Sequence, residues 1–214
     1  MPQVKIITDL VSEPVTLAEI TNYVKLDESI TAENTLITDM ITAARQLVEE
    51  ETNLSFGTKT IEAYFYRDEI SENFGDNDNS NGFQFILPYS PHSLVSKVTA
   101  IDSNGAETDL VLGTDYRIRG NFFFEVKLMT SFFNNLVSGS FIGYEAYRIT
   151  YQAGYGCVKD TPPGALATPA MPKIAKIAIM ETVKAWYNRT SDEHTLDPKV
   201  RRMLAQISMK PVFS

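Results

Sequence analysis

The side chains that most often carry out catalysis are scarce in this chain. Cys157 is the only cysteine, and His92 and His194 are the only histidines. A cysteine nucleophile needs a neighbouring base, and a structural zinc site needs four ligands of the Cys and His type. We therefore expect neither chemistry. A single cysteine also excludes an intrachain disulfide and is typical of a reducing compartment.

One acidic, asparagine-rich stretch resembles a metal site. Asp76, Asp78 and Ser80 have the spacing of the first ligands of a calcium-binding loop. Gly82, however, comes one position too late, and Leu87 stands where such a loop has a bidentate glutamate. Glycine-rich phosphate loops and nucleophile elbows do not occur either. The sequence therefore predicts no enzyme, no cofactor and no metal.

The composition indicates a folded protein with an uneven charge distribution. The chain has 214 residues, is 43% hydrophobic and carries a net charge of −8, which argues against tight binding to a polyanion. Residues 16–53 include two basic and eight acidic side chains, whereas residues 171–214 include eight basic and four acidic ones. These segments are complementary, either within one chain or between copies. We see no signal peptide or membrane span and expect a soluble protein.

A helical hairpin is expected near the N-terminus. Thr16 and Glu19 have the spacing of a capping box, and Val15 and Ile20 have that of a hydrophobic staple, which predicts a short helix to about Lys25.

A longer helix is expected from Thr31 to Leu54, with Thr31 as its N-cap and with Arg45 and Glu49 on its polar side. Its apolar residues repeat at helical spacing, at Leu36, Met40, Ala44, Leu47 and Leu54, with Ile37, Ile41 and Val48 alongside. We assign Leu36, Met40 and Leu47 to the helical core or to contacts between subunits.

After Leu54 the spacing of apolar residues changes from that of a helix to that of a strand. Runs rich in β-branched and aromatic residues predict strands at 58–67, 83–87, 94–101, 108–112, 116–119, 122–128 and 146–152. Asp102 to Gly105 has the composition of a hairpin turn. Strands this short and closely spaced are typical of an antiparallel sandwich or barrel. In the run Phe122 to Phe124 we expect core packing with one exposed ring.

Helices return after a stretch rich in proline and glycine, residues 156–169. A helix is predicted from Pro172 or Lys173 to about Asn188. Because it is apolar on several faces, Ile177, Met180 and Trp186 belong either to the core of one domain or to a contact with a neighbouring subunit.

A last helix begins at the N-cap Asp197 and its following Pro198. Val200, Met203, Leu204 and Ile207 form its apolar stripe. Met209, Pro211, Val212 and Phe213 follow in a short apolar tail.

The predicted fold class is α+β. Residues 1–56 and 170–214 form a discontinuous helical domain, residues 57–155 an inserted antiparallel β-sandwich or barrel-like domain, and residues 156–169 a linker between them.

Several segments resemble the head–tail connector family of tailed bacteriophages and gene transfer agents, also called adaptor or head-completion proteins. The segments are PVTLAEITNYVKLDES, NTLITDMITAARQLVEEETNLSF, LPYSPHSLVSKVTAIDSNG, DYRI, YRITYQAGYG and AWYNRT, and they occur in the family's order. The resemblance implies a structural virion protein, assembled in the host cytoplasm into a ring of about twelve subunits. The ring would lie beneath the portal, extend the channel for genomic DNA without sequence-specific binding, and meet a tail-side stopper or tail-terminator protein.

The resemblance also implies that the C-terminal region contacts the portal. The expected residues are Val200, Met203, Leu204, Ile207, Met209, Pro211, Val212 and Phe213. An alternative class stays open: the β domain could be a binding module for a glycan or a host surface, with the helices as its oligomerisation platform.

Overall fold

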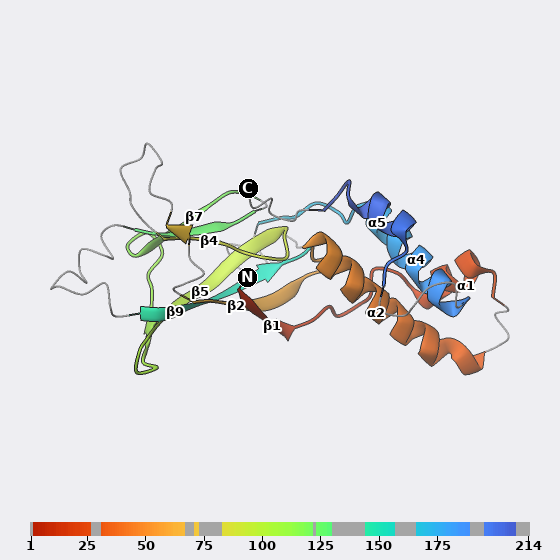
Figure 1. Ribbon diagram of the computed structural model, residues 1–214, viewed down its shortest axis with the longest axis horizontal. Coiled ribbons are helices and arrows are strands. Elements are labelled where there is room, and N and C mark those ends of the chain that lie inside the picture. The colour runs from red at the N-terminus through yellow and green to blue at the C-terminus, as the bar shows by residue number, and fades with distance from the viewer. Residues whose placement is uncertain are drawn as a thin grey trace. The chain divides into compact units, whose positions relative to one another are not determined.

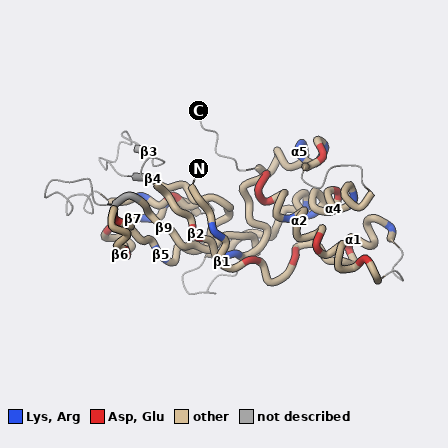
Figure 2. Tube along the Cα trace, turned by 60° about the horizontal axis from the view of Figure 1, so that its bottom comes forward, with Lys and Arg blue, Asp and Glu red and all other residues tan. Residues whose placement is uncertain are grey.

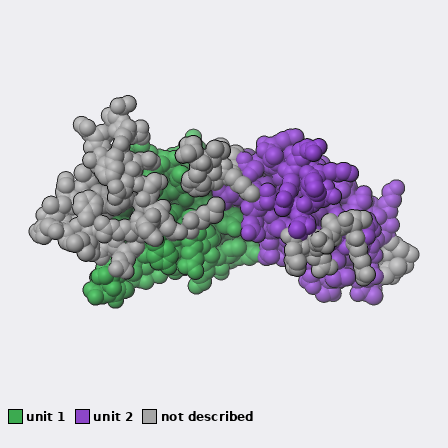
Figure 3. Space-filling view, viewed as in Figure 1, with its two compact units in different colours: residues 1–9, 58–168 green, residues 10–57, 169–214 purple. Residues whose placement is uncertain are grey.

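The chain folds as two compact units in a computed structural model (Figure 1). The structure describes residues 2–26, 31–66, 71–72, 83–121, 123–129, 144–156, 166–188 and 195–208. The β unit comprises residues 1–9 and 58–168, and the helical unit comprises residues 10–57 and 169–214 (Figure 3). The α+β class is therefore correct.

The β unit contains two antiparallel sheets. A five-stranded sheet has the order β1-β2-β9-β5-β6, and a four-stranded sheet has the order β3-β4-β8-β7. The strands are β1 (Gln3–Thr8), β2 (Lys59–Tyr66), β3 (Ser71–Glu72), β4 (Phe83–Ile86), β5 (His92–Asp102), β6 (Glu107–Asp109), β7 (Tyr116–Arg119), β8 (Glu125–Leu128) and β9 (Tyr144–Ala153).

The N-terminal strand β1 differs from the sequence interpretation, which placed residues 1–56 in the discontinuous helical domain, whereas residues 1–9 belong to the β unit. β1 pairs antiparallel with β2, from Gln3 opposite Tyr64 to Thr8 opposite Thr60. Asp9 then lies 3.4 Å from the ammonium group of the buried Lys59. Strand pairing between segments more than fifty residues apart leaves no local signature, so the pattern of β1 alone did not indicate its partner.

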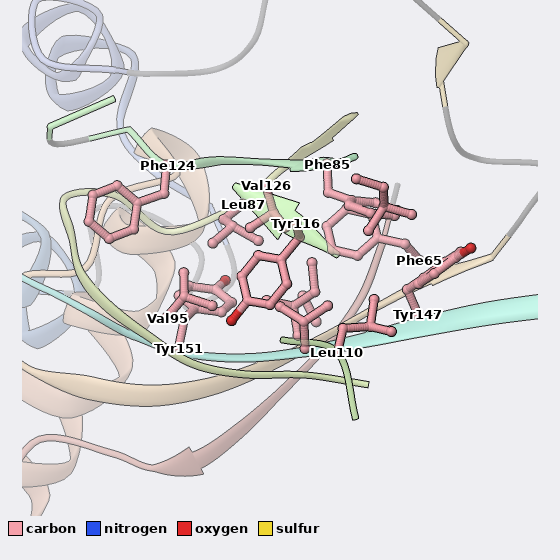
Figure 4. Packing of buried hydrophobic residues seen from close by; sticks show 14 of the residues in the cluster. Phe65, Phe85, Leu87, Val95, Leu110, Tyr116, Phe124, Val126, Tyr147 and Tyr151 are labelled. Atoms are coloured by element: carbon pink, nitrogen blue, oxygen red, sulfur yellow. The ribbon is translucent and has the colours of Figure 1, made fainter. Parts of the chain in front are cut away.

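One hydrophobic core fills the space between the two sheets (Figure 4). Phe85 of the smaller sheet has its ring centroid 5.0 Å from that of Phe65 and 5.1 Å from that of Tyr147, both of the larger sheet. Phe124 is buried and Phe123 is 44% exposed, so the prediction of one core ring and one exposed ring holds for these two residues. Face-to-face packing of this kind is that of a β-sandwich.

The hairpin between β5 and β6 has the predicted turn. Gly105 has φ +80°, a conformation that glycine adopts at little cost. The carboxylate of Asp102 accepts hydrogen bonds from the backbone N–H groups of Asn104 (2.8 Å) and Ala106 (2.7 Å).

The helical unit contains α1 (Leu17–Val24), the 3₁₀ turn η1 (Thr31–Glu33), α2 (Asn34–Thr52), α4 (Lys173–Tyr187) and α5 (Pro198–Leu204). Its central pair is α2 and α4, which pack against each other, and α1 and α5 contact both (Figure 1).

Helix α4 begins at Lys173, as predicted, and the predicted side-chain caps of the other helices are present in two cases of three. The capping box of α1 is present, because the Thr16 hydroxyl accepts from Glu19 N–H and the Glu19 carboxylate accepts from Thr16 N–H. Asp197 caps α5, accepting from Lys199 N–H at 2.7 Å. The prediction that Thr31 caps α2 is wrong: Thr31 begins η1, and Glu33, which precedes α2, makes no side-chain cap.

Candidate interaction surfaces

The inner side of α2 forms the core of the helical unit. Ile37, Ile41, Ala44 and Val48 are all less than 4% exposed. They recur at spacings of three and four residues, which places them on one side of the helix. Ala175, Ala178, Ile179 and Val183 of α4 are fully buried in the same unit. Small alanines on α4 allow two helices to approach closely.

A buried charge network lies beside this core, and its position corrects the sequence interpretation. Arg45 and Glu49 were assigned to the polar side of the helix, but they are only 1% and 2% exposed. Arg45 Nε donates to Glu13 Oε2 at 2.8 Å, and its Nη1 donates to Glu49 Oε2 at 2.7 Å. Glu49 Oε1 accepts from the backbone N–H of Phe56 at 2.8 Å. Opposite charges buried together satisfy each other's hydrogen bonds, so they can occupy a core that neither could enter alone.

A second apolar strip on α2 is exposed or only half-buried within the unit. Leu36 is 52% exposed, Ala43 is exposed, and Met40 and Leu47 are half-buried. At about 100° per residue these four side chains fall within an arc of roughly 60°, beside the inner side. We call these four residues the α2 stripe. Leu36, predicted for the core or for a subunit contact, is therefore not in the core of this unit, and Met40 and Leu47 lie only at its margin.

The outer side of α4 is open in the same way. Ile177 is 40% exposed and Met180 is half-buried, whereas Trp186 is 5% exposed. Ile177 and the fully buried Ile179 are two residues apart, so they point to nearly opposite sides of the helix. Of the three α4 residues predicted for core or subunit contacts, Trp186 lies in the core, and its Nε1 has no hydrogen-bond acceptor among the described residues.

Polar contacts join α4 to the N-terminal half of the unit. Lys176 Nζ lies 2.5 Å from Glu19 Oε1, and this bond holds the pKa of the Glu19 carboxyl below its usual value. The Tyr23 hydroxyl donates to the Glu181 carboxylate, which raises the pKa of Tyr23 to about 12. Part of the charge difference between the two ends of the chain is thus neutralised within one copy.

One side of the last helix, α5, is buried in the helical unit, and the other side carries exposed basic residues. Val200 and Leu204, predicted for a portal contact, are 3% and 1% exposed, so both are covered by the unit itself. Met203 is half-buried, and Ile207 is half-buried just after the helix ends. Lys199, Arg201 and Arg202 are exposed. Met209, Pro211, Val212 and Phe213 lie outside the described residues.

The described residues contain no group of three or more His, Cys, Asp or Glu side chains that could hold a metal ion. The loop with Asp76, Asp78 and Ser80 lies outside that part of the chain, as does Cys157. In the same described part, no helix is long and apolar enough to cross a membrane.

Both acidic and basic residues lie along the helical unit (Figure 2).

The fold has counterparts among solved structures. A chain in the neck of an empty GTA particle computed with C6 symmetry superposes with a TM-score of 0.62 and 14% identity, covering 96% of this chain and 95% of that one. A chain in the virion of the native gene transfer agent particle gives a TM-score of 0.64 with 15% identity, covering 96% and 95%. A chain in the neck of the native GTA particle computed with C12 symmetry gives 0.57 with 15% identity, covering 97% and 94%.

This chain has the fold of those particle proteins. The likeness covers nearly the whole of both chains, so it includes the β unit as well as the helical unit. No protein-family model and no curated protein sequence matches the chain.

The sequence interpretation missed two features of these surfaces. Ala43 was not included in any apolar surface, although its spacing from Met40 and Leu47 is helical. The charge network was missed too, although Arg45 and Glu49 have the i, i+4 spacing of a helical ion pair. That spacing occurs as often on solvated faces, so it predicts an ion pair but not its burial.

Proposed function

We propose that this chain is a structural protein of the neck of a phage-like particle, where copies form a ring beneath the portal, continue the DNA channel and join the head to the tail. The observation that carries the proposal is the shared fold with chains of the GTA neck over 96% or more of this chain. The segments that resemble the head–tail connector family support it independently. In this role the protein works by shape and contact, without an enzymatic step.

Symmetry supports the ring. The two neck structures were computed with C6 and C12 symmetry. A head-to-tail contact between identical subunits that closes on itself generates a cyclic ring. We therefore propose a ring of about twelve copies, with the portal on one side and a tail-side stopper or tail-terminator protein on the other.

The acidic character of the chain fits a DNA conduit. Its net charge of −8 disfavours tight contacts with phosphate groups. A channel that moves DNA must not hold it, so we propose that genomic DNA passes without sequence-specific binding.

Ring formation is tested by native mass spectrometry and electron microscopy of the full chain, alone and mixed with its cognate portal protein. We expect closed rings with a fixed copy number, either alone or on the portal. A chain that stays monomeric under both conditions, at concentrations up to the millimolar range, would show that the proposal is wrong.

We further propose that the portal contact is made by the C-terminal tail. Val200 and Leu204 are buried, and of the expected contact residues that the structure describes only Met203 and Ile207 are half-buried. In the sequence the apolar residues Met209, Pro211, Val212 and Phe213 follow. Burying Val212 and Phe213 in a portal groove would contribute roughly 1.5–3 kcal/mol per side chain before ordering costs, multiplied over the copies in a ring.

Truncation after Ser208 tests the tail. The shortened chain keeps α5 complete, so we expect its thermal unfolding to match that of the full chain while its binding to the portal, measured by sedimentation, is lost. Undiminished portal binding by the shortened chain would refute the assignment. A Lys210→Ala change serves as a control, because it alters the tail without removing its apolar groups.

A further inference from the structure

The helical unit carries two open strips of equal length on different helices. The α2 stripe runs from Leu36 to Leu47. On α4, Lys173 and Ile177 are exposed and Met180 and Lys184 are half-buried, with the same spacing of four, three and four residues. We call these four residues the α4 stripe. Each strip spans eleven residue steps, about 16 Å along its helix, and an arc of roughly 60°.

The two strips have opposite electrostatic character. Asp39 and Glu50, both exposed on α2, lie about 50–70° from the middle of the α2 stripe. The α4 stripe is apolar in its centre and has a lysine at each end. Glu181 is the only acidic residue of α4, and its single negative charge offsets only one of the two lysine charges. Lys184 Nζ also lies 5.4 Å from the centre of the Tyr23 ring, which holds it at the surface of α4.

The strips also lie outside the contact between their helices. The residues of α4 opposite Ile177, such as Ile179, are fully buried, so the α4 stripe points away from α2. On α2 the centre of the buried inner side lies roughly 100° from the middle of the α2 stripe. One copy therefore cannot bring its own two strips together. A second copy can, because its α4 stripe is free to meet the α2 stripe of the first.

We infer that the α2 stripe of one copy packs against the α4 stripe of the next, forming the subunit contact of the proposed ring; the inference rests on that proposed function. Apolar residues meet in the centre of the contact, while Lys173 and Lys184 meet the acidic side chains beside the α2 stripe. A contact between two different surfaces of the same chain is heterologous, the type that closes into a ring. The isologous alternative would place the acidic α2 surfaces of two copies against each other, and like charges there oppose association.

Charge reversal tests the pairing of the two surfaces. We compare the full chain with Lys173→Glu/Lys184→Glu, with Asp39→Lys/Glu50→Lys, and with the chain that combines all four changes. Sedimentation in about 50 mM salt, where surface charges are weakly screened, measures assembly. We expect each double variant to raise the dissociation constant of assembly at least about tenfold. The combined variant regains assembly because it restores opposite charges.

Two further readouts make this comparison specific. The combined variant is expected to assemble with itself but not with the unchanged chain, since a mixed contact places like charges together. The control Lys199→Glu/Arg202→Glu makes the same charge change as the α4 variant but on α5, and we expect it to leave assembly unchanged. All changed residues are exposed or half-buried at the surface, so circular dichroism should show an unaltered helical signal.

Photo-crosslinking identifies the contact directly. A benzophenone amino acid replaces Ala43, at the middle of the α2 stripe, in chains labelled with ¹⁵N and mixed with unlabelled chains. We expect crosslinks between copies to residues 173–184. The same probe at Thr38, exposed about 140° around α2, is expected to give none there.

The outcomes separate the inference from the proposed ring. Chains that assemble while the Ala43 probe reacts elsewhere, or while the combined variant fails to regain assembly although folded, overturn this contact and leave the ring proposal standing. Chains that stay monomeric and give no crosslinks between copies, with or without the portal, overturn both.

Discussion

Arg45 connects three parts of the helical unit through charged hydrogen bonds. Its guanidinium group bonds to Glu13 in the segment before α1 and to Glu49 one turn along α2, and Glu49 also accepts from Phe56 N–H after the helix. A buried network of this kind specifies one arrangement of these segments, since any other leaves a charge without a partner.

Replacing Arg45 by methionine should destabilise the helical unit strongly. The change keeps most of the packed volume but leaves the buried Glu49 carboxylate without its cation, a loss of roughly 3–5 kcal/mol. Urea unfolding followed by circular dichroism measures the change. Glu13, with a side chain that is 23% exposed, provides the comparison: Glu13→Gln should cost only about 1 kcal/mol or less. If both changes lowered the unfolding free energy equally, burial of the Arg45–Glu49 pair would not be what makes the network stabilising.

His92 is a buried, hydrogen-bonded polar residue of the β unit, as Arg45 is of the helical unit. It is 1% exposed, its Nδ1 accepts from Phe124 N–H at 2.8 Å, and its Nε2 lies 2.9 Å from the Pro88 carbonyl oxygen, to which it donates. Both ring nitrogens are thus used, and the neutral tautomer with its proton on Nε2 satisfies both bonds.

His92→Phe keeps an aromatic ring in this position but removes both hydrogen bonds. The Pro88 carbonyl keeps the hydrogen bond from the Tyr151 hydroxyl at 2.9 Å, so only the buried Phe124 N–H loses its partner. We therefore expect a loss of roughly 1–3 kcal/mol in the unfolding free energy. Ser96→Ala removes a 2.9 Å bond to the Thr150 carbonyl oxygen at an exposed site and should change stability by less than about 1 kcal/mol. A His92→Phe protein as stable as the unchanged one would mean that another group satisfies Phe124 N–H.

Among the elements, α2 is a helix whose apolar surface is only partly covered within its own unit. Its inner side packs within the unit, the Arg45 network covers a flank, and the α2 stripe stays open. A helix with apolar residues over so wide an arc needs cover on more than one side. Within the unit only part of that cover is supplied, which is why the helix is well suited to contacts between copies.

β1 is the edge strand whose loss should matter most. It pairs with β2, its Val4 packs against the core cluster, and Ile6 and Ile7 are 42% and 46% exposed. Removing residues 1–9 uncovers the edge of β2 and also removes the packing of the partly buried Val4 against the core. The loss of the Val4 packing alone would lower the unfolding free energy by roughly 1–2 kcal/mol.

We expect the shortened chain to unfold at a lower temperature and to aggregate faster, because β2 would present unpaired backbone groups along its length. Differential scanning calorimetry and light scattering measure the two effects. Pro2→Ala, outside the strand, is the matched control. Unchanged unfolding of the shortened chain would show that β1 adds nothing to the sheet.

For the whole molecule, we propose that the helical unit is a domain built from both ends of the chain. α4, from the C-terminal half, packs on α2, and ion pairs such as Lys176–Glu19 connect segments 157 residues apart. A chain with residues 10–57 and 169–208 joined by a Gly/Ser linker should therefore stay helical and unfold cooperatively, as measured by circular dichroism during heating. Loss of all helical signal would contradict the discontinuous domain.

The sequence by itself determined the features that depend on neighbouring residues. The capping box of α1, the start of α5 at Asp197, the hairpin turn at Asp102 and the α+β class followed from spacings of a few residues. Most strand positions followed as well, since alternation along a strand records which side is buried. These features are local, and the chain encodes them locally.

The tertiary structure alone decided where distant segments meet. β1 joins the sheet instead of the helices because β2 has an open edge for it, which nothing within residues 3–8 records. Arg45 and Glu49 are buried because Glu13 and Phe56 converge on them, whereas the same pair on an isolated helix would be a solvated ion pair. Leu36 and Ile177 stay open although their spacing is that of core residues. Periodicity specifies which residues share a side of a helix, but only the packing of the other elements specifies which side is covered.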